Sequence, residues 1–361
     1  MRITDVKASV VFGSSLFVQV FTDEGITGLG ECSPMHLGAL VHFVNTILKP
    51  LCVGKDPLEI DKLWTSMYYD TYKLGDTGLK MEAISGVDIA LWDIFGKVPI
   101  VTLLGGCYRE KVRMYASLGV AKSRDWRDRR TPLEMARLVE RNVELGFTAI
   151  KIRMHWEYNV DVDPETDWQI FRECKRVTGD AIPLSFDANN GYSEATAIQQ
   201  GRRFESLGIY HYEEPVMVDD YAAYARVADA LDVPIAAGEH EYTRWQFREL
   251  IQRGRVDIIQ PDVVKCGGFS EIRKIAALGE AHHKQMVPHM TMPSVGTAAN
   301  IHFVASLRDA HRPQELTRVD QRLNALFKEP LVFEDGYLTV PRKPGLGLEL
   351  DEKAFARACE A

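Results

Sequence analysis

The spacing of hydrophobic residues changes near residue 110 and divides the chain into two parts. In the first part, short apolar segments bounded by turn residues predict three strands, at residues 2–10, 16–22 and 26–31. Longer segments with helical spacing follow, at residues 38–50, 57–72 and 80–97. We therefore expect the first part to form a small α+β domain.

The predicted helix at 80–97 has one wide apolar face. Its hydrophobic residues recur at intervals of three, four and seven positions, as in Ile84, Val87, Leu91, Ile94 and Phe95. Asp88 and Asp93 lie at the flanks of this face. We expect both to be ion-paired residues with a structural role.

Beyond residue 112, eight short apolar segments alternate with amphipathic helical segments. The predicted strands are VRMYASL, FTAIKIR, IPLSFDA, IYHYEE, PIAAGE, VDIIQPD, QMVPH and a weak segment near Gln314. Repeated strand and helix units predict a parallel barrel. We thus expect an α/β protein whose modified (β/α)8-type (TIM-like) barrel spans 111–329. The N-terminal α+β capping domain, 1–110, would be completed by the turn-rich C-terminal segment 330–361, packed back onto it.

Three acidic residues follow successive barrel strands at equal intervals. Asp187, Glu213 and Glu239 are separated by 213 − 187 = 26 and 239 − 213 = 26 residues, about the length of one strand and one returning helix. Parallel strands place these carboxylates at one mouth of the barrel, where they would repel each other unless a cation binds them. Hard oxygen ligands favour Mg²⁺ over Zn²⁺.

The other predicted strand ends carry further polar residues that would face the same mouth. They are Lys151 and Arg153 on the second strand, Asn189 after the third, Asp262 and Lys265 after the sixth, His289 after the seventh and Glu315 on the eighth. Asp262 would hydrogen-bond to one ring nitrogen of His289, which fixes the tautomer and raises the basicity of the imidazole. Such a pair is suited to moving a proton.

Composition and charge exclude several classes of partner. The net charge of −8 argues against nucleic acid and against an anionic membrane. The six cysteines are scattered without a CxxC pair, which is typical of reduced thiols in a cytosolic protein. The N-terminus lacks the apolar core of a signal peptide, and no apolar run reaches the length of about 18 residues that a membrane span needs. We expect a cytoplasmic protein with a small-molecule substrate.

Several motifs together resemble the enolase superfamily and, within it, the mandelate racemase subgroup. The matching segments are SGVDIALWDIFGK (85–97), KIR (151–153), FDAN (186–189), EEP (213–215), GEH (238–240), QPDVVKCGG (260–268), VPH (287–289) and the terminal PGLGLEL. The resemblance covers nearly the whole chain. It implies an N-terminal capping domain over a barrel, Mg²⁺ on Asp187, Glu213 and Glu239, and a His base that forms an ene-diolate. It also implies a homo-oligomer, since family members commonly form dimers and octamers.

Within the subgroup, the chain is most similar to acid-sugar dehydratases, particularly the L-rhamnonate dehydratase type. The similarity rests on His155 and Trp156 after the second strand, on GEH in place of GEN, and on QPDVVKCGG. It implies that the substrate contacts Asn189, His155, His240 and Lys265. A packing role for His240 and an ion pair for Lys265 are the alternative interpretations.

Arg153 distinguishes dehydration from racemisation. Mandelate racemase has a lysine at this position, which serves as the second base, whereas arginine keeps its proton above pH of about 12. One competent base, His289, can remove the C2 proton of a sugar acid (aldonate or aldarate) and return it to the departing C3 hydroxyl. The expected product is a 2-keto-3-deoxy acid. A racemase or epimerase of a 2-hydroxy acid is the alternative enzyme, and a barrel that binds a ligand without turnover is the alternative from another class.

Overall fold

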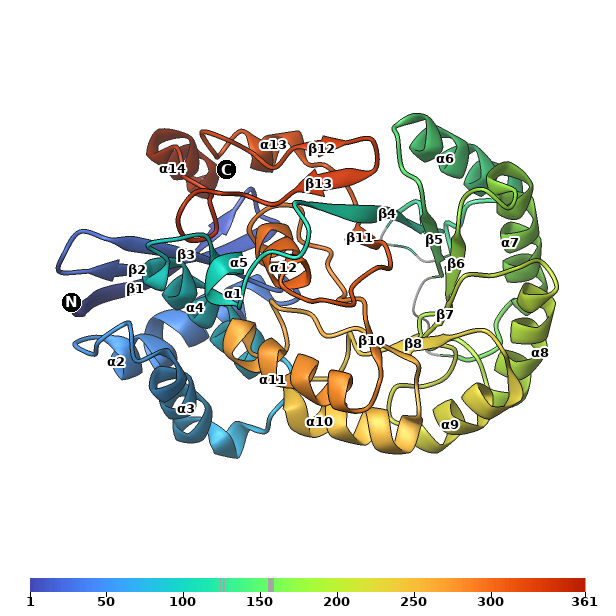
Figure 1. The fold of residues 1–361 in the computed structure, drawn as a ribbon, viewed down its shortest axis with the longest axis horizontal. Helices are drawn as coiled ribbons and strands as arrows, with labels where there is room; N and C mark the ends of the chain where they lie inside the picture. The colour runs from blue at the N-terminus through green and yellow to red at the C-terminus, as the bar shows by residue number, and fades with distance from the viewer. Residues whose placement is uncertain (124, 126, 155–158, 361) are drawn as a thin grey trace.

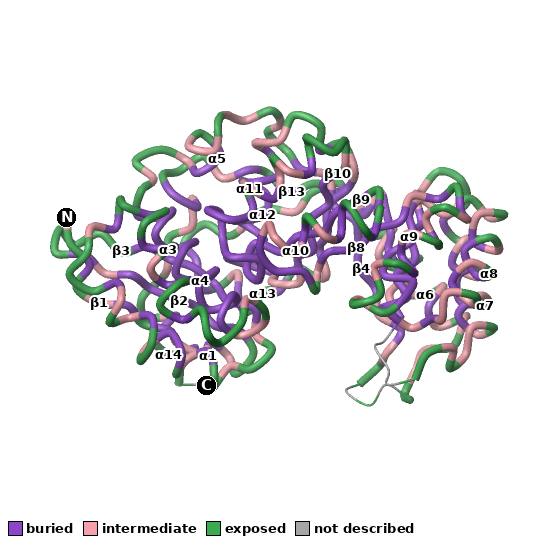
Figure 2. Tube along the Cα trace, turned by 90° about the horizontal axis from the view of Figure 1, so that it is seen from below, coloured by how far each residue is buried: buried purple, intermediate pink, exposed green. Residues whose placement is uncertain are grey.

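The computed structural model describes residues 1–123, 125, 127–154 and 159–360. The N-terminal elements and the end of the chain lie on one side of the molecule, and a barrel ringed by helices lies on the other (Figure 1). Buried backbone is continuous through both parts, and the exposed residues are mainly at the periphery (Figure 2). No helix in these ranges is long and apolar enough to cross a membrane.

The N-terminal part is a three-stranded antiparallel sheet covered by helices. Its strands are β1 (Ile3–Val11), β2 (Ser15–Thr22) and β3 (Thr27–Cys32), in that spatial order. The helices that follow are α1 (Leu37–His42), the π-helical Phe43–Leu48, α2 (Lys49–Cys52), α3 (Ile60–Asp70), the 3₁₀ turn Tyr72–Leu74, α4 (Leu79–Phe95) and α5 (Ile100–Leu103). Helix α4 packs closely on β3 and is buried over most of its length. The elements predicted before residue 110 are therefore present.

Eight parallel strands form the barrel. They are β4 (Lys111–Gly119), β5 (Ile150–Arg153), β6 (Leu184–Asp187), β7 (Tyr212–Glu213), β8 (Ile235–Ala237), β9 (Ile258–Ile259), β10 (Gln285–Met286) and β11 (Gln314–Leu316). Neighbours pair in sequence order from β4 to β10, and β11 pairs in parallel with β4. The last strand of the series thus lies beside the first, as a barrel requires.

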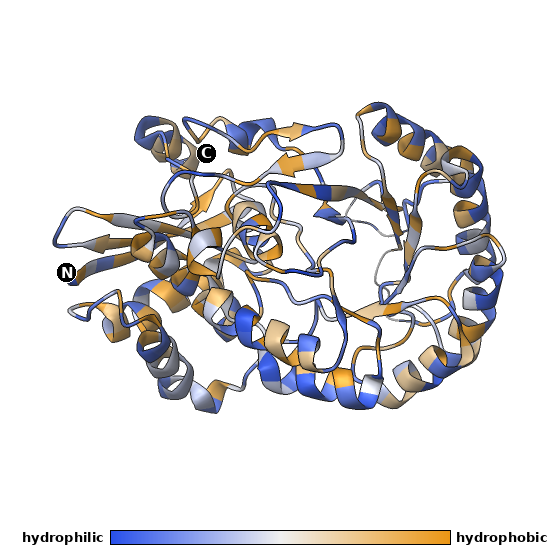
Figure 3. Ribbon diagram, viewed as in Figure 1, coloured by the Kyte–Doolittle hydropathy of each residue, from blue (hydrophilic) through white to orange (hydrophobic). Residues whose placement is uncertain are grey.

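Helices connect the strands and surround them. They are α6 (Pro132–Glu144), α7 (Pro164–Thr178), α8 (Glu194–Glu205), α9 (Tyr221–Ala230), α10 (Thr243–Glu249) with the π-helical Leu250–Gly254, α11 (Gly268–Ala281) and α12 (Val295–Ala305). Hydrophobic and hydrophilic residues alternate along the outer helices α6–α9 (Figure 3), so one face of each can pack inward. Helix α12 differs because it is buried throughout.

Local sequence signals set where several of these helices begin. The Thr131 side chain accepts from the Glu134 N–H, and the Glu134 carboxylate accepts from the Thr131 N–H at 2.7 Å, which is a capping box at the start of α6. At the starts of α7, α8 and α9, the side chains of Asp163, Ser193 and Asp220 each accept from the N–H three residues further on, without the reciprocal bond of a capping box among the described residues. These local bonds therefore fix the residue at which each of the four helices begins.

The C-terminal segment contacts both parts of the molecule. After α13 (Gln321–Asn324), the hairpin β12 (Phe333–Glu334) and β13 (Tyr337–Thr339) pairs with the first residues of β4, with Leu338 opposite Val112. Beyond the hairpin, the Gly345 carbonyl accepts from the Ile100 N–H at 2.9 Å, and α14 (Glu352–Glu360) packs on β1. The hairpin departs from the expectation that the tail packs on the N-terminal part, because β13 pairs with the barrel strand β4.

The N-terminal part contacts the loop that follows β8, through Tyr242 and Glu82, and the loop that follows β9. The Trp64 indole donates to the Gly267 carbonyl at 2.8 Å, and the Gly267 N–H donates to the Ser85 hydroxyl at 2.8 Å. These loops leave the carboxyl ends of the barrel strands, where the site residues are predicted. We propose that 1–110 with 330–361 act as a cap on this mouth, and that 111–329 are the catalytic barrel.

Asp88, which is buried, and Asp93, which is half-buried, are hydrogen-bond acceptors and not ion-paired residues. Asp88 accepts from the Ser270 N–H at 3.0 Å, and Asp93 accepts from the N–H groups of Leu29 and Leu346 at 2.9 and 2.7 Å. Neither has a basic group within 4.0 Å in the described ranges. The ion-pair prediction is wrong because α4 is covered on nearly every side, so the two acids meet backbone groups of other segments.

Replacing Asp88 by asparagine should flatten the pH dependence of stability. Burial raises the pKa of Asp88 from its usual 3.8 to about 7, and the hydrogen bonds from Ser270 oppose this rise. The folded state thus binds the proton more tightly than the unfolded state. Its contribution to stability is complete below pH 3.8 and is lost as the pH rises through about 7. Urea unfolding at several pH values between these limits should show a smaller loss for D88N than for the natural chain.

The control for this change is Asp180→Asn, which removes a fully exposed acid that pairs with Lys175 at 3.2 Å. D180N should keep the pH profile of the natural chain. Parallel profiles for D88N and the natural chain would show that the Asp88 carboxyl does not titrate in this range.

Replacing Gly30 by alanine should destabilise the contact between β3 and α4. A Cβ atom at this position would lie 2.0 Å from the Gly86 carbonyl oxygen, which is backbone and cannot rotate away. We expect a loss of about 3 kcal/mol in the free energy of unfolding, measured by chemical denaturation. Gly38→Ala is the matched control because nothing lies within 4 Å of its Cβ position. Equal stabilities for the two variants would contradict this account of the packing.

Candidate active site

Acidic side chains end two neighbouring strands at the mouth of the barrel. Asp187 is the last residue of β6 and Glu213 is the last residue of β7, and the two are paired in register. Glu239 follows β8 by two residues. The Asp187 and Glu213 side chains are almost completely buried, and Glu239 is 14% exposed. The three residues predicted as metal ligands therefore gather at one end of adjacent strands.

Lys151 lies inside this acidic cluster. Its Nζ contacts Glu213 Oε1 and lies 3.4 Å from Asp187 Oδ2 and 3.3 Å from Glu315 Oε1. Burial lowers the pKa of Lys151, but the surrounding carboxylates, Glu213 first, raise it well above the usual value. The ammonium group therefore keeps its proton and neutralises part of the cluster.

His289 and Asp262 form the pair that their spacing predicts. His289 Nδ1 lies 2.7 Å from Asp262 Oδ2, and Asp262 Oδ1 accepts from the Val264 N–H at 2.9 Å. The other ring nitrogen, Nε2, lies 2.9 Å from Glu239 Oε2. Burial lowers the pKa of His289, whereas Glu239, Glu315 and Asp262 raise it well above the usual value. The imidazole is thus oriented by Asp262, and its Nε2 faces the acidic cluster.

Glu315 connects the two sides of the mouth. It lies on β11, where its Oε2 accepts from the Met290 N–H at 2.9 Å and its Oε1 faces Lys151. Its side chain is almost completely buried. Glu315 therefore holds the backbone after His289 in place. Its contact with Lys151 also joins the charged groups of β5 and β11.

A second Glu, adjacent to a predicted ligand, was missed by the sequence analysis. Within the described ranges, the side chains of Glu214, Glu239 and His240 bring possible ligand atoms within 4.8 Å of one another. His240 Nε2 lies 3.3 Å from Glu239 Oε1 and 3.6 Å from Glu214 Oε1. Glu214 has a positive φ of 42°, which strand alternation does not anticipate. The doubled Glu of the EEP motif was the available signal.

The cluster fits a hard divalent cation. Asp187 Oδ1 accepts from the Asn189 N–H at 2.8 Å, whereas the buried Oδ2 has Lys151 Nζ at 3.4 Å but accepts no hydrogen bond among the described residues. Burial, followed by the charge of Glu213, raises the pKa of Asp187 well above its usual value. A bound cation would supply the missing partner and offset the repulsion, and carboxylate oxygens are the ligands that Mg²⁺ prefers.

Arg153, Asn189 and Lys265 complete the predicted set that the structure describes. Arg153 ends β5 opposite Asp187, and its buried Nε has no hydrogen-bond partner within the described ranges. Asn189 and Lys265 lie beside the acids, and each is 7% exposed. The backbone of Asn189 has a positive φ of 47°. His155 and Trp156 lie outside the described residues.

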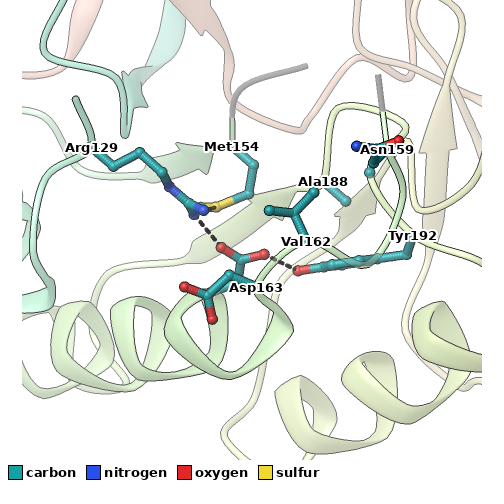
Figure 4. A pocket seen from close by; sticks show the side chains of 9 residues that line it. Arg129, Met154, Asn159, Val162, Asp163, Ala188 and Tyr192 are labelled. Atoms are coloured by element: carbon teal, nitrogen blue, oxygen red, sulfur yellow. Dashed lines mark hydrogen bonds and ion pairs between the residues drawn. The ribbon is translucent and has the colours of Figure 1, made fainter. Parts of the chain in front are cut away.

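A small cavity lies beside the start of α7, where Met154 after β5 and Ala188 after β6 contribute to its lining. Figure 4 shows Arg129 and Tyr192 joined by dashed lines to one carboxylate between them, and the contacts of both residues identify it as that of Asp167. The Tyr192 hydroxyl donates to Asp167 at 2.7 Å, and burial raises the pKa of Asp167. Arg129 and Tyr192 thus both bind the Asp167 carboxylate, so the cluster has a structural role in positioning α7.

Comparison with known proteins places the whole chain in one family. Residues 4–105 match the family model of the mandelate racemase/muconate lactonizing enzyme N-terminal domain, and residues 134–354 match that of the enolase C-terminal domain-like family. A protein from Paracoccus denitrificans named mandelate racemase/muconate lactonizing protein has a similar structure, with a TM-score of 0.93 and 37% identity, over 99% of this chain and 97% of the other. The same protein has also been solved in complex with magnesium.

Curated relatives of similar length carry enzyme names. An arabinonate dehydratase from Saccharolobus solfataricus is 36% identical over 342 residues, which is 93% of this chain and 88% of the relative. A D-galactarolactone cycloisomerase from Agrobacterium fabrum is 36% identical over 352 residues, or 94% and 90% of the two chains. With a cap model and a barrel model matched in order, this chain belongs to the mandelate racemase/muconate lactonizing enzyme family of the enolase superfamily.

Proposed function

We propose that this protein is a Mg²⁺-dependent dehydratase that converts a sugar acid into a 2-keto-3-deoxy acid. The observation that carries the proposal is the His289–Asp262 pair, whose Nε2 lies 2.9 Å from Glu239 Oε2 in the acidic cluster. Relatives named as arabinonate, D-galactonate and D-xylonate dehydratases, at 31–36% identity, support the same reaction class.

Asp187, Glu213 and Glu239 would hold the cation, with Glu214 as the neighbouring alternative to Glu213. When bound, Mg²⁺ would stabilise the negative charge that develops on the substrate carboxylate as the C2 proton leaves. Lys151 and Glu315 balance charge around this position, because the Lys151 ammonium is shared by Glu213, Glu315 and Asp187.

His289 would perform both proton transfers. In its neutral form, Nε2 takes the C2 proton, while Asp262 accepts from Nδ1–H and stabilises the imidazolium that forms. The electron pair of the broken C2–H bond forms the C1–C2 double bond of an enol. This collapses to a C2–C3 double bond as the C3–O bond breaks, and the Nε2 proton goes to the departing hydroxyl, which leaves as water. The resulting enol of C2 and C3 then tautomerises to the keto acid.

Dehydration fits these residues better than racemisation does. Racemisation needs a second base on the opposite side of C2. On β5, Arg153 carries a guanidinium, which has donors but no acceptor, and the Lys151 ammonium is enclosed by three carboxylates. A single base that returns its proton to a leaving group is sufficient for elimination.

An isomerase is the second candidate, because the cycloisomerase relative is as similar as the arabinonate dehydratase. The two reactions differ in their products. A panel of aldonates, aldarates and their lactones should be incubated with the protein and Mg²⁺, and 2-keto acids detected with semicarbazide. Formation of a keto acid with loss of water supports the dehydratase. Isomeric products that retain the elements of water, with solvent deuterium incorporated at the carbon next to the carboxyl group, would favour the isomerase.

A further inference from the structure

Three buried polar side chains meet where the N-terminal part covers the barrel mouth. Glu82 belongs to α4, Tyr242 precedes α10, and Lys265 lies in the loop between β9 and α11. Their exposed fractions are 4%, 9% and 7%. The Tyr242 hydroxyl donates to Glu82 Oε1 at 3.4 Å, so the group bridges the two parts of the molecule.

Lys265 has no direct partner in this group. Its Nζ lies 5.8 Å from the centroid of the Tyr242 ring, and it has no carboxylate within 4.0 Å and no hydrogen bond within the described ranges. A buried ammonium without a partner is costly, so its three donors are expected to bind a further group. Lys265 was a candidate for substrate contact from the sequence, but its partners Glu82 and Tyr242 were not.

A backbone contact places this group next to the His289 pair, because the Lys265 N–H donates to the carbonyl of Asp262 at 3.0 Å, and Asp262 is the partner of His289. Burial lowers the pKa of Lys265, while Glu239 is the strongest of the neighbours that raise it. Burial raises the pKa of Glu82, Lys265 opposes that rise, and Asp262 adds to it. A substrate whose carboxyl end is at the metal cluster would therefore extend toward Glu82, Tyr242 and Lys265.

We propose, on the basis of the proposed function, that Glu82, Tyr242 and Lys265 form a subsite for the hydroxyl groups at the far end of an aldonate. The Glu82 carboxylate accepts from hydroxyls and the Lys265 ammonium donates to their oxygens, which suits a neutral diol. An aldarate carries a second carboxylate at that end. This would bring a like charge beside Glu82 in a desolvated space, so the subsite selects aldonates over aldarates.

The test compares a six-carbon aldonate with the aldarate oxidised at its far end. Glu82→Gln removes the like charge, so the ratio of kcat/KM for the aldonate to that for the aldarate should fall at least about tenfold. Lys265→Met should lower kcat/KM for both substrates. Tyr242→Phe keeps the packing and removes one hydroxyl, so it should shift the ratio in the same direction as E82Q but by less.

Surface changes of the same chemistry serve as controls. Glu59→Gln and Lys62→Met alter an exposed pair joined at 2.7 Å, and they should leave the ratio unchanged. If E82Q and Y242F lower thermal stability but keep the ratio of the natural chain, the group only fastens the cap, and the proposal is overturned.

Ligand binding separates this proposal from the assignment of dehydration. The rise in melting temperature caused by each acid with Mg²⁺ should be measured alongside turnover. If the aldonate stabilises the natural chain but not E82Q, and no keto acid forms, the subsite stands and dehydration is wrong. If the aldonate gives neither stabilisation nor turnover, the subsite proposal fails as well.

Discussion

His289→Asn should lower kcat for dehydration about 10³-fold and abolish exchange of the C2 proton with solvent. Both effects are expected together because one imidazole would accept the C2 proton and deliver it to the C3 hydroxyl. Asparagine can occupy much of the same space, but it cannot accept a proton at neutral pH. Keto acid formation and deuterium exchange at C2, measured on the same samples, would test the coupling.

Two further variants, Asp262→Asn and His283→Asn, help to interpret the result for His289→Asn. Asp262→Asn should lower kcat by disturbing the tautomer of His289, with a smaller effect on KM. His283→Asn is the matched control, since His283 is an exposed histidine before β10 and should be silent. If H289N retained stereospecific exchange at C2, the base would have to lie elsewhere, with β5 the first place to look, and the isomerase would become the preferred function.

Glu213→Gln should remove both activity and the stabilisation of the protein by Mg²⁺. A ligand that binds only the folded state stabilises it by about 2.7 kcal/mol at roughly 100 times its dissociation constant. The natural chain should show such a rise in a Mg²⁺ titration followed by chemical denaturation, and a chelator should reverse it. The E213Q variant should show neither, because it loses one anionic ligand.

Glu214→Gln separates the two possible ligand sets. Glu213 is held by Lys151 and Gln260, whereas Glu214 faces His240 and accepts from Asn190 at 2.9 Å. If Glu213 is the ligand, E214Q should retain Mg²⁺-dependent stabilisation with reduced affinity. A normal response in E213Q together with none in E214Q would transfer the ligand role to Glu214. Glu249→Gln, a surface change, should match the natural chain in both assays.

The barrel was predictable because its signals are local and repeated. Most strands are short apolar segments with a polar residue at or soon after their end, and several helices have a start signal, such as Thr131 or Ser193. The interval that separates Asp187, Glu213 and Glu239 follows from the length of one strand and one helix. The family motifs added the roles of His289 and the metal ligands.

Contacts between distant segments were beyond this reasoning. Glu82 and Tyr242 are 160 positions apart, and nothing in either local sequence indicates that they meet. The direction of Glu214 depends on a positive φ that the alternation of a strand cannot indicate. The enclosure of Lys151 by three carboxylates likewise follows from the closure of the barrel and not from the segment KIR.

The position of the C-terminal segment determines the order in which the chain can complete its fold during synthesis. The Phe12 N–H donates to the Ala358 carbonyl at 2.9 Å, and the Phe17 and Phe355 rings stack at 6.1 Å. Strands β1 and β2 are synthesised well before α14, so the surface that α14 covers stays open until that helix emerges. Strand β4 must also wait for β11 and β13. The nascent protein thus exposes apolar surface while these partners are being made, which makes it a candidate for chaperone binding in that interval.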